Sequence, residues 1–138
     1  AITVALWFGE KSPADPDDTQ QVTRGMSVYA QHCASCHGAR LEGQANWRER
    51  LPSDRMPAPP HDASGHTWHH PDAVLFGITK YGLVPGKYAP PGYQSDMPAF
   101  SGALSDPEIW AVLAYIKSSW PSDFRRTQQE MTLKQSRR

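Results

Sequence analysis

This sequence is poor in several features that would by themselves suggest a function. Its 138 residues include only two cysteines, and both lie in one short motif. If that motif uses both thiols to bind a cofactor, none remains for a structural disulfide. The 14 basic residues balance the 14 acidic ones, which gives no electrostatic support for nucleic-acid binding. Hydrophobic residues form 38% of the chain, a low share for a domain that must build its core unaided. A bound apolar group would make up this shortage.

The apolar run at the N-terminus, residues 2–8, is too short to cross a membrane, which takes about 20 residues. The charged, proline-containing residues 9–18 follow it at once. Such an abrupt boundary is typical of the end of a membrane segment. We therefore interpret residues 1–18 as the remnant of a membrane anchor with its tether, and a strand or arm packed on the domain is the alternative.

The most informative motif that is present is Cys33-Ala34-Ser35-Cys36-His37. Cys-x-x-Cys-His is the spacing at which a c-type haem is attached. The two thiols form thioethers with the haem, and the adjacent histidine becomes an axial ligand of the iron. The motif therefore predicts one covalent haem c, bound through Cys33 and Cys36, with His37 on the metal. The haem would also supply the apolar surface that the composition lacks.

Two other uses of this cysteine pair have less support. A redox dithiol needs a βαβ context, whereas here a helical pattern leads into the pair. A zinc site needs further ligands, and His66, His69 and His70 lie outside the usual zinc-binding spacings. Together with His61 these histidines could collect a separate copper or zinc ion, although ordinary hydrogen-bonding histidines are the simpler interpretation.

Three segments carry apolar residues at helical spacing. The first begins after Asp18 as N-cap, with Gln21 as its capping-box partner, and leads to Cys33. The second covers residues 71–82, where Leu75 and Ile78 are expected to face the core or the haem. The third covers residues 105–120. Its capping box is Ser105 with Glu108, its stripe is Ile109, Val112, Leu113 and Ile116, and Pro121 stops it. In the first of these segments, which begins after Asp18, the expected apolar face comprises Val22, Gly25, Met26, Tyr29, Ala30 and Cys33.

The second axial ligand is expected in the loop of residues 83–104. Of the four methionines, Met97 alone lies in this loop, far enough beyond His37 for the chain to pass around the haem. Prolines in the loop restrict the unfolded chain and so lower the entropy lost when a weak thioether ligand is held in place. The sequence therefore predicts Met97 as the ligand opposite His37.

The order of these elements resembles the class I cytochrome c family over roughly residues 19–120. The resemblance implies an all-α cytochrome c fold, with three main helices and long loops around one haem. It implies that Gly25 and Tyr29 cross the last helix near Tyr115, and that His37 and Met97 are the axial pair.

The resemblance also implies that the carbonyl of Pro59 accepts a hydrogen bond from His37. Two residues later, where the family usually has a leucine against the haem, this chain has His61. Trp68 precedes the middle helix, where its indole N–H would either bond a haem propionate or be satisfied within an aromatic plug.

These observations divide the chain into the N-terminal segment 1–18, a haem domain of residues 19–121 and a basic C-terminal extension of residues 122–138. Solvated surface is the default interpretation of the extension; a packed segment and a docking strip for an acidic partner are the alternatives.

With both axial positions filled, the iron has no open site for substrate, so the resemblance implies a one-electron carrier rather than an enzyme. Haem attachment to such motifs takes place outside the cytoplasm, which indicates the bacterial periplasm, with or without a tether to the inner membrane. Redox proteins are the expected partners, oriented by residues such as Arg40, Lys80 and Lys87. The alternatives are a haem c subunit of a larger oxidase or dehydrogenase, and a gas-binding or peroxidase-like haem protein.

Overall fold

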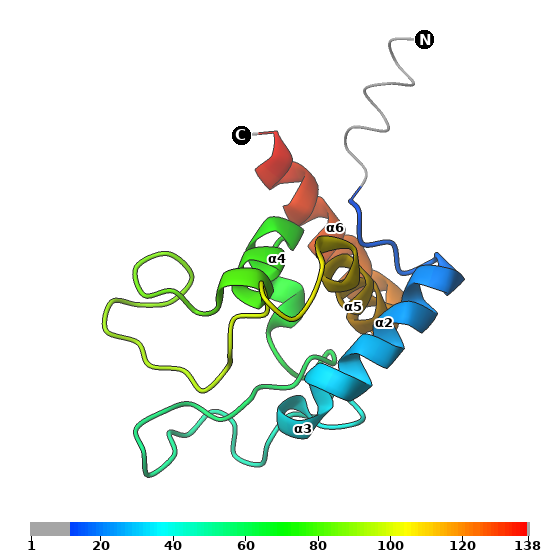
Figure 1. Cartoon of the computed structure of the whole chain (residues 1–138). Coiled ribbons are helices and arrows are strands. Elements are labelled where there is room, and N and C mark those ends of the chain that lie inside the picture. Colours follow the sequence, from blue (N-terminus) through cyan, green and yellow to red (C-terminus); the bar gives the residue numbers. More distant parts are fainter. Residues whose placement is uncertain (1–11, 138) are drawn as a thin grey trace, which may run out of the picture.

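The computed structural model describes residues 12–137, and within this range the regular elements are helices, with no sheet (Figure 1). This confirms the expected all-α fold class. The expected three main helices correspond to α2, α4 and α5, and a further long helix, α6, follows them. The elements are α2 (Thr19–His32), α3 (Ala34–His37), the 3₁₀ helix η1 (Thr67–His69), α4 (Asp72–Tyr81), α5 (Asp106–Ser118) and α6 (Ser122–Ser136).

Helix α2 begins as the sequence predicts, because the Asp18 carboxylate accepts the backbone N–H groups of Gln20 and Gln21. The expected capping box is wrong in its second half. The Gln21 side chain reaches further back, accepting the N–H of Asp15 and donating to the carbonyl of Pro13, so it fixes the preceding chain instead of the cap. Two residues of the expected apolar face, Met26 and Ala30, are exposed, and Val28 is buried in their place.

The most extensive helix–helix contact joins α2 to α5. Gly25 allows this close contact, because a Cβ at this position would lie 1.9 Å from the carbonyl oxygen of Ala111. The Tyr29 and Tyr115 rings meet beside this point, with centroids 5.4 Å apart. The crossing implied by the resemblance is thus confirmed, and it exists because a residue without a side chain lets the two backbones approach.

Helix α5 opens with the predicted capping box of Ser105 and Glu108. It ends at Ser118, two residues before the expected end. All four residues of its apolar stripe are buried, and Ala111, Ala114 and Lys117 are buried as well. Helix α5 is therefore the central helix of the core, enclosed on more than one face.

The tail after Pro121 is not simply solvated surface, so the default expectation for it is wrong. Residues Ser122–Ser136 form α6, which packs against η1. The Phe124 ring lies 4.7 Å from the Trp68 ring, measured between centroids, and Gln128 is 2% exposed. The sequence of the tail does not reveal these few inward-facing positions, because most of its other residues face solvent and many of them are basic.

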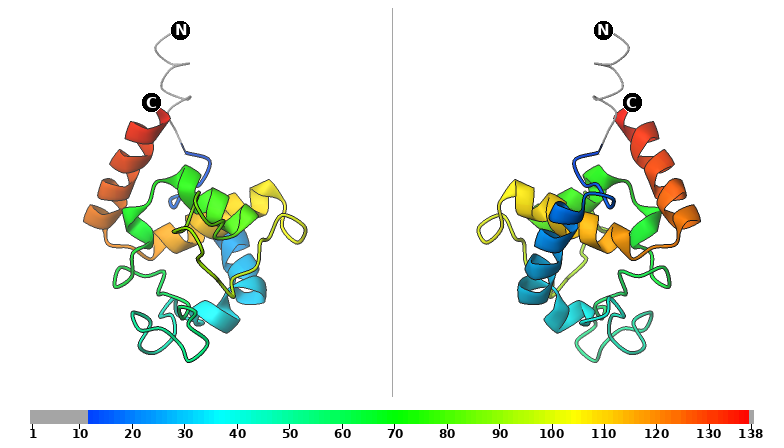
Figure 2. Two further views of the ribbon diagram at one scale, coloured as in Figure 1. Left: turned by 90° about the vertical axis from the view of Figure 1, so that its left-hand side faces the viewer. Right: turned by 90° about the vertical axis from the view of Figure 1, so that its right-hand side faces the viewer.

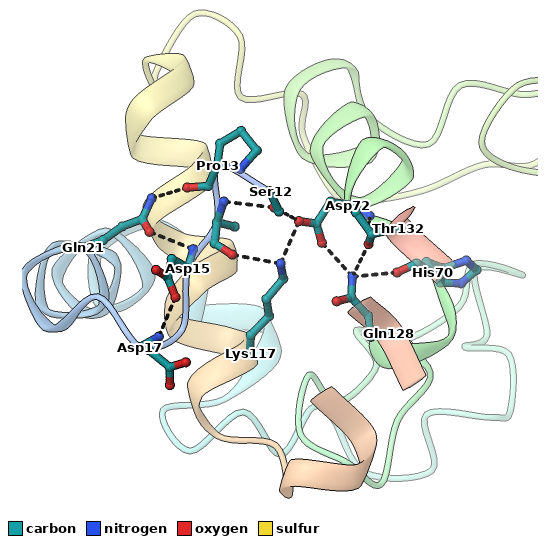
Figure 3. Close-up of polar contacts among 11 residues, drawn as sticks. Ser12, Pro13, Asp15, Asp17, Gln21, His70, Asp72, Lys117, Gln128 and Thr132 are labelled. Carbon is teal, nitrogen blue, oxygen red and sulfur yellow. Dashed lines mark hydrogen bonds and ion pairs between the residues drawn. The ribbon is translucent and has the colours of Figure 1, made fainter. Parts of the chain in front are cut away.

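A buried polar cluster joins the N-terminal segment, α4, α5 and α6 (Figure 3). The Lys117 ammonium donates to Asp72 at 2.7 Å and to the carbonyl of Ala14 at 3.0 Å. Gln128 donates to the second oxygen of Asp72 at 2.6 Å, and Ser12 bonds the first. Burial lowers the pKa of Lys117, and the charge of Asp72 opposes this shift. The cluster borders a cavity of about 360 Å³ that none of the expected haem ligands lines.

Two long loops complete the molecule. The loop of residues 38–66 lies beside α3 at the lower end of both views in Figure 2, and the loop of residues 83–104 joins α4 to α5. None of the helices in residues 12–137 combines the length and apolar character needed to cross a membrane. The expected anchor remnant, residues 2–8, lies outside the described residues.

Candidate haem site

The Cys-x-x-Cys-His motif begins at the last turn of α2. Cys33 caps this helix, donating its N–H to the carbonyl of Tyr29 at 2.9 Å, and the following residues form the single turn α3. Both cysteines are free thiols; Cys33 is half-buried against the core and Cys36 is exposed. Burial and the neighbouring Cys36 raise the pKa of Cys33 to about 11. Two unpaired thiols therefore lie close to His37 in the chain, that of Cys33 just before α3 and that of Cys36 within it.

His37 is buried, with 7% of its surface exposed. Its Nδ1 lies 2.8 Å from the carbonyl oxygen of Pro59, as the resemblance implied. When Nδ1–H donates to that carbonyl, the lone pair of the neutral ring is on Nε2, the atom that would bind a metal. Burial lowers the pKa of His37, although the bond to Pro59 acts in the opposite direction. The bond to Pro59 thus orients the ring as an axial ligand requires.

Backbone packing holds the Pro59 carbonyl in place. Gly43 lies against it at φ +71°, and a Cβ there would be 2.5 Å from the nitrogen of Pro60. Gly65 approaches the next residue, since a Cβ there would be 2.1 Å from the carbonyl oxygen of Pro60. The N–H of Gly43 also donates to the carbonyl of His37 at 2.6 Å, which links the motif directly to the loop that orients it.

We call the close approach of Gly43 to the backbone of Pro59 and Pro60 the clamp, and Gly43→Ala tests it. We expect the free energy of unfolding to fall by about 2–4 kcal/mol, because alanine is strained at positive φ and also collides with the backbone of Pro60. Gly92 is the matched control: its φ is +77°, but nothing lies within 4 Å of its missing Cβ, so Gly92→Ala should cost only the strain, about 1 kcal/mol. Urea unfolding followed by circular dichroism measures both, and equal losses would contradict the clamp.

Met97 is half-buried and packs against the core cluster. Its N–H donates to Ser95, and just beyond it the N–H of Phe100 donates to the carbonyl of Thr79 at 3.0 Å, which ties the loop to the end of α4. On the other side, Arg55 pairs with Asp96. The loop that carries the thioether is therefore anchored to α4 and to the loop that carries Pro59. Its role as an iron ligand stays a prediction.

The other expected haem contacts differ in their surroundings. Leu75 is buried in the core cluster and Ile78 is half-buried. The Trp68 N–H lies 3.2 Å from the carbonyl oxygen of Ala63 and 3.1 Å from that of Gly65. The indole N–H of Trp68 is therefore satisfied by the backbone, which was one of the two expectations for it.

The histidines of the 61–70 segment belong to no cluster of three metal-ligating side chains within the described part of the chain. His66 packs edge-on against Trp47 and against His69, and His69 lies on Trp68. Among the basic residues expected to orient a partner, Arg40 and Lys87 are exposed, whereas Lys80 is paired with Asp106 at 2.9 Å.

His61 is the residue whose position the sequence did not predict. Its ring stacks on the ring of His37, with centroids 4.0 Å apart and an interplanar angle of 30°. Burial and the neighbouring His37 lower the pKa of His61 well below its ordinary value. The only signal in the sequence was the departure from leucine after Pro59, and that signal gives no direction for the ring.

The side chains assembled here fit a covalently bound haem c. Two free thiols stand at the required spacing, Nε2 of His37 is available when Nδ1–H donates to Pro59, and a methionine lies on a separately anchored loop. Histidine nitrogen with thioether sulfur is a donor pair that holds haem iron in cytochromes.

Comparison with known proteins agrees with this fit. The cytochrome c family matches residues 22–120. A gluconate 2-dehydrogenase cytochrome c subunit from Pantoea cypripedii is 29% identical over 129 residues, which are 91% of this chain and 24% of that protein. The chain thus spans about a quarter of the length of this relative, and no solved structure gives a significant match. Because the family match covers well over half of the chain and includes the haem-attachment motif, the protein belongs to the cytochrome c family.

Proposed function

We propose that this cytochrome c carries one electron at a time on a haem c bound through Cys33 and Cys36, with His37 and Met97 as axial ligands. The observation that carries the proposal is the buried His37 ring, oriented by the Pro59 carbonyl beside two free thiols. When bound, the haem supplies an iron that alternates between the ferric and ferrous states.

The protein's own groups would set how that electron is held. Pro59 fixes the ring of His37, and the anchored loop presents the sulfur of Met97 from a different part of the chain. Two protein ligands leave no coordination position for a substrate, which favours electron transfer over catalysis at the metal. A thioether ligand and an apolar pocket both favour the ferrous state and so raise the reduction potential.

We propose the bacterial periplasm as the location, because covalent haem attachment to this motif takes place outside the cytoplasm. Residues 19–121 would be the haem domain. The end of the preceding segment is packed on this domain and is no free tether, because Ala14 is 2% exposed and its carbonyl accepts a hydrogen bond from Lys117. In the extension of residues 122–138, the packing of Phe124 and Gln128 supports a role in the folded body.

A second candidate is a haem c subunit within a dehydrogenase complex, and the similarity to the cytochrome c subunit of a gluconate 2-dehydrogenase favours it. In that case the electron donor is a bound dehydrogenase instead of a transient partner. Affinity purification of the full chain from its natural host distinguishes the two. A stoichiometric dehydrogenase that survives washing at high salt supports the subunit, and a chain recovered alone supports the free carrier.

Met97→Ala tests the axial pair in the purified holoprotein. We expect the weak sulfur-to-iron charge-transfer band to disappear, the ferrous protein to bind carbon monoxide rapidly and the reduction potential to fall, because the thioether is lost. Met26→Ala is the control, since Met26 is 51% exposed on α2 and should leave all three properties unchanged. A wild-type protein that lacks the band and binds carbon monoxide readily would instead indicate a gas-binding or peroxidase-like haem.

A further inference from the structure

The imidazole of His37 has one edge and one face in contact with fixed groups. At its edge, Nδ1 bonds the Pro59 carbonyl; at its face, the ring of His61 lies 4.0 Å away and 30° from parallel. This hydrogen bond, together with the ring's own Cβ–Cγ bond, places Nδ1 but leaves the plane of the ring some room to tilt. A flat ring against the face removes this remaining freedom.

His61 is itself held at three points. Its backbone N–H donates to the carbonyl of Leu41 at 2.9 Å, and its own carbonyl accepts the indole N–H of Trp120 at 2.8 Å. At the ring, Nδ1 lies 2.8 Å from the hydroxyl oxygen of the buried Thr67. The Thr67 hydroxyl in turn reaches the carbonyl of Pro60, at 3.5 Å. If the Thr67 hydroxyl donates its proton to that carbonyl, its oxygen can accept Nδ1–H of His61. His61 Nδ1, the Thr67 hydroxyl and the Pro60 carbonyl then each have a partner.

We propose that His61, anchored by Thr67, is a positioning residue that sets the plane of the His37 imidazole and thereby the orientation of the axial ligand over the haem. The inference rests on the proposed function, because it takes His37 as an iron ligand. Leucine, the residue that the resemblance leads one to expect here, can fill the same space. It cannot match a flat ring face to face or hold its angle through a directional hydrogen bond.

The first variant to examine is His61→Leu in the full holoprotein. We expect the sulfur-to-iron band to remain, since both axial ligands remain. We also expect the g-value anisotropy of the ferric protein and the order of its paramagnetically shifted haem methyl resonances to change, because both depend on the plane of the axial imidazole. The reduction potential should rise, since an aliphatic group replaces a polar ring beside the metal.

Further variants separate positioning from packing. Thr67→Val keeps the stacked ring but removes its anchor, and should shift the methyl resonances in the same sense by a smaller amount. His61→Phe restores a flat ring and should return the pattern toward that of the wild type. His66→Leu makes the same chemical change at an exposed histidine and should leave the spectra unchanged. Thermal unfolding of each variant reports stability independently.

Unchanged g values and methyl shifts in folded His61→Leu would overturn the proposal, even if the variant were less stable, because His61 would then only fill space. Should the leucine variant fail to take up haem, the same readouts on Thr67→Val and His61→Phe decide. A wild-type protein without the sulfur band would refute the proposed axial pair itself. By contrast, a wild type that shows the band, with variants that show no spectral change, would refute only the role of His61.

Discussion

Gly25→Ala is expected to lower the free energy of unfolding by about 3 kcal/mol or more, one of the largest effects of any single substitution in this chain. The added Cβ would lie 1.9 Å from the carbonyl oxygen of Ala111 and 2.9 Å from the Cβ of Tyr115. A backbone carbonyl within a helix cannot move aside by itself, so α2 and α5 must separate. The gain of about 1 kcal/mol in helix propensity from glycine to alanine does not offset this.

The matched control is Gly102→Ala. Gly102 has open space around its missing Cβ, so alanine there should change stability by no more than about 0.5 kcal/mol. Guanidinium unfolding of the two holoproteins, followed by far-ultraviolet circular dichroism, measures the difference. A Gly25→Ala protein as stable as the wild type would show that the two helices do not meet as closely as described.

Lys117→Met should destabilise the protein by about 3–5 kcal/mol, because it leaves the buried carboxylate of Asp72 without its counter-charge. The carbonyl of Ala14 also loses its donor. The hydrogen bond from Gln128 to Asp72 remains but cannot replace a full positive charge. Since this cluster joins the N-terminal segment to α4, α5 and α6, we expect the loss to loosen both ends of the folded chain (Figure 3).

Lys134→Met on the exposed side of α6 is the control and should be nearly neutral. The double variant Lys117→Met with Asp72→Asn should be more stable than Lys117→Met alone, because it removes the unpaired charge as well. Urea unfolding of the four proteins completes the comparison. A single variant that costs less than about 1 kcal/mol, or a double variant that is less stable still, would show that Asp72 does not depend on Lys117.

Local signals in the sequence predicted most of the helices. The cap at Asp18, the capping box at Ser105 and the glycine after α4 act over three or four residues, so the neighbouring sequence is enough to recognise them. Helix α6 escaped prediction because only a few of its residues, such as Phe124 and Gln128, face inward. Its order depends on a surface formed by η1 and Asp72, which the tail's own sequence does not reveal.

By itself the sequence indicated the cofactor, since Cys33, Cys36 and His37 stand close together at the spacing typical of haem attachment. Tertiary structure decided which groups surround that site. Only the folded chain puts Pro59 on the edge of His37 and His61 on its face, and it directs the Trp68 N–H to the backbone. The physical reason, for His37, is that the orientation of its ring depends on contacts with residues more than twenty positions away, which no local pattern specifies.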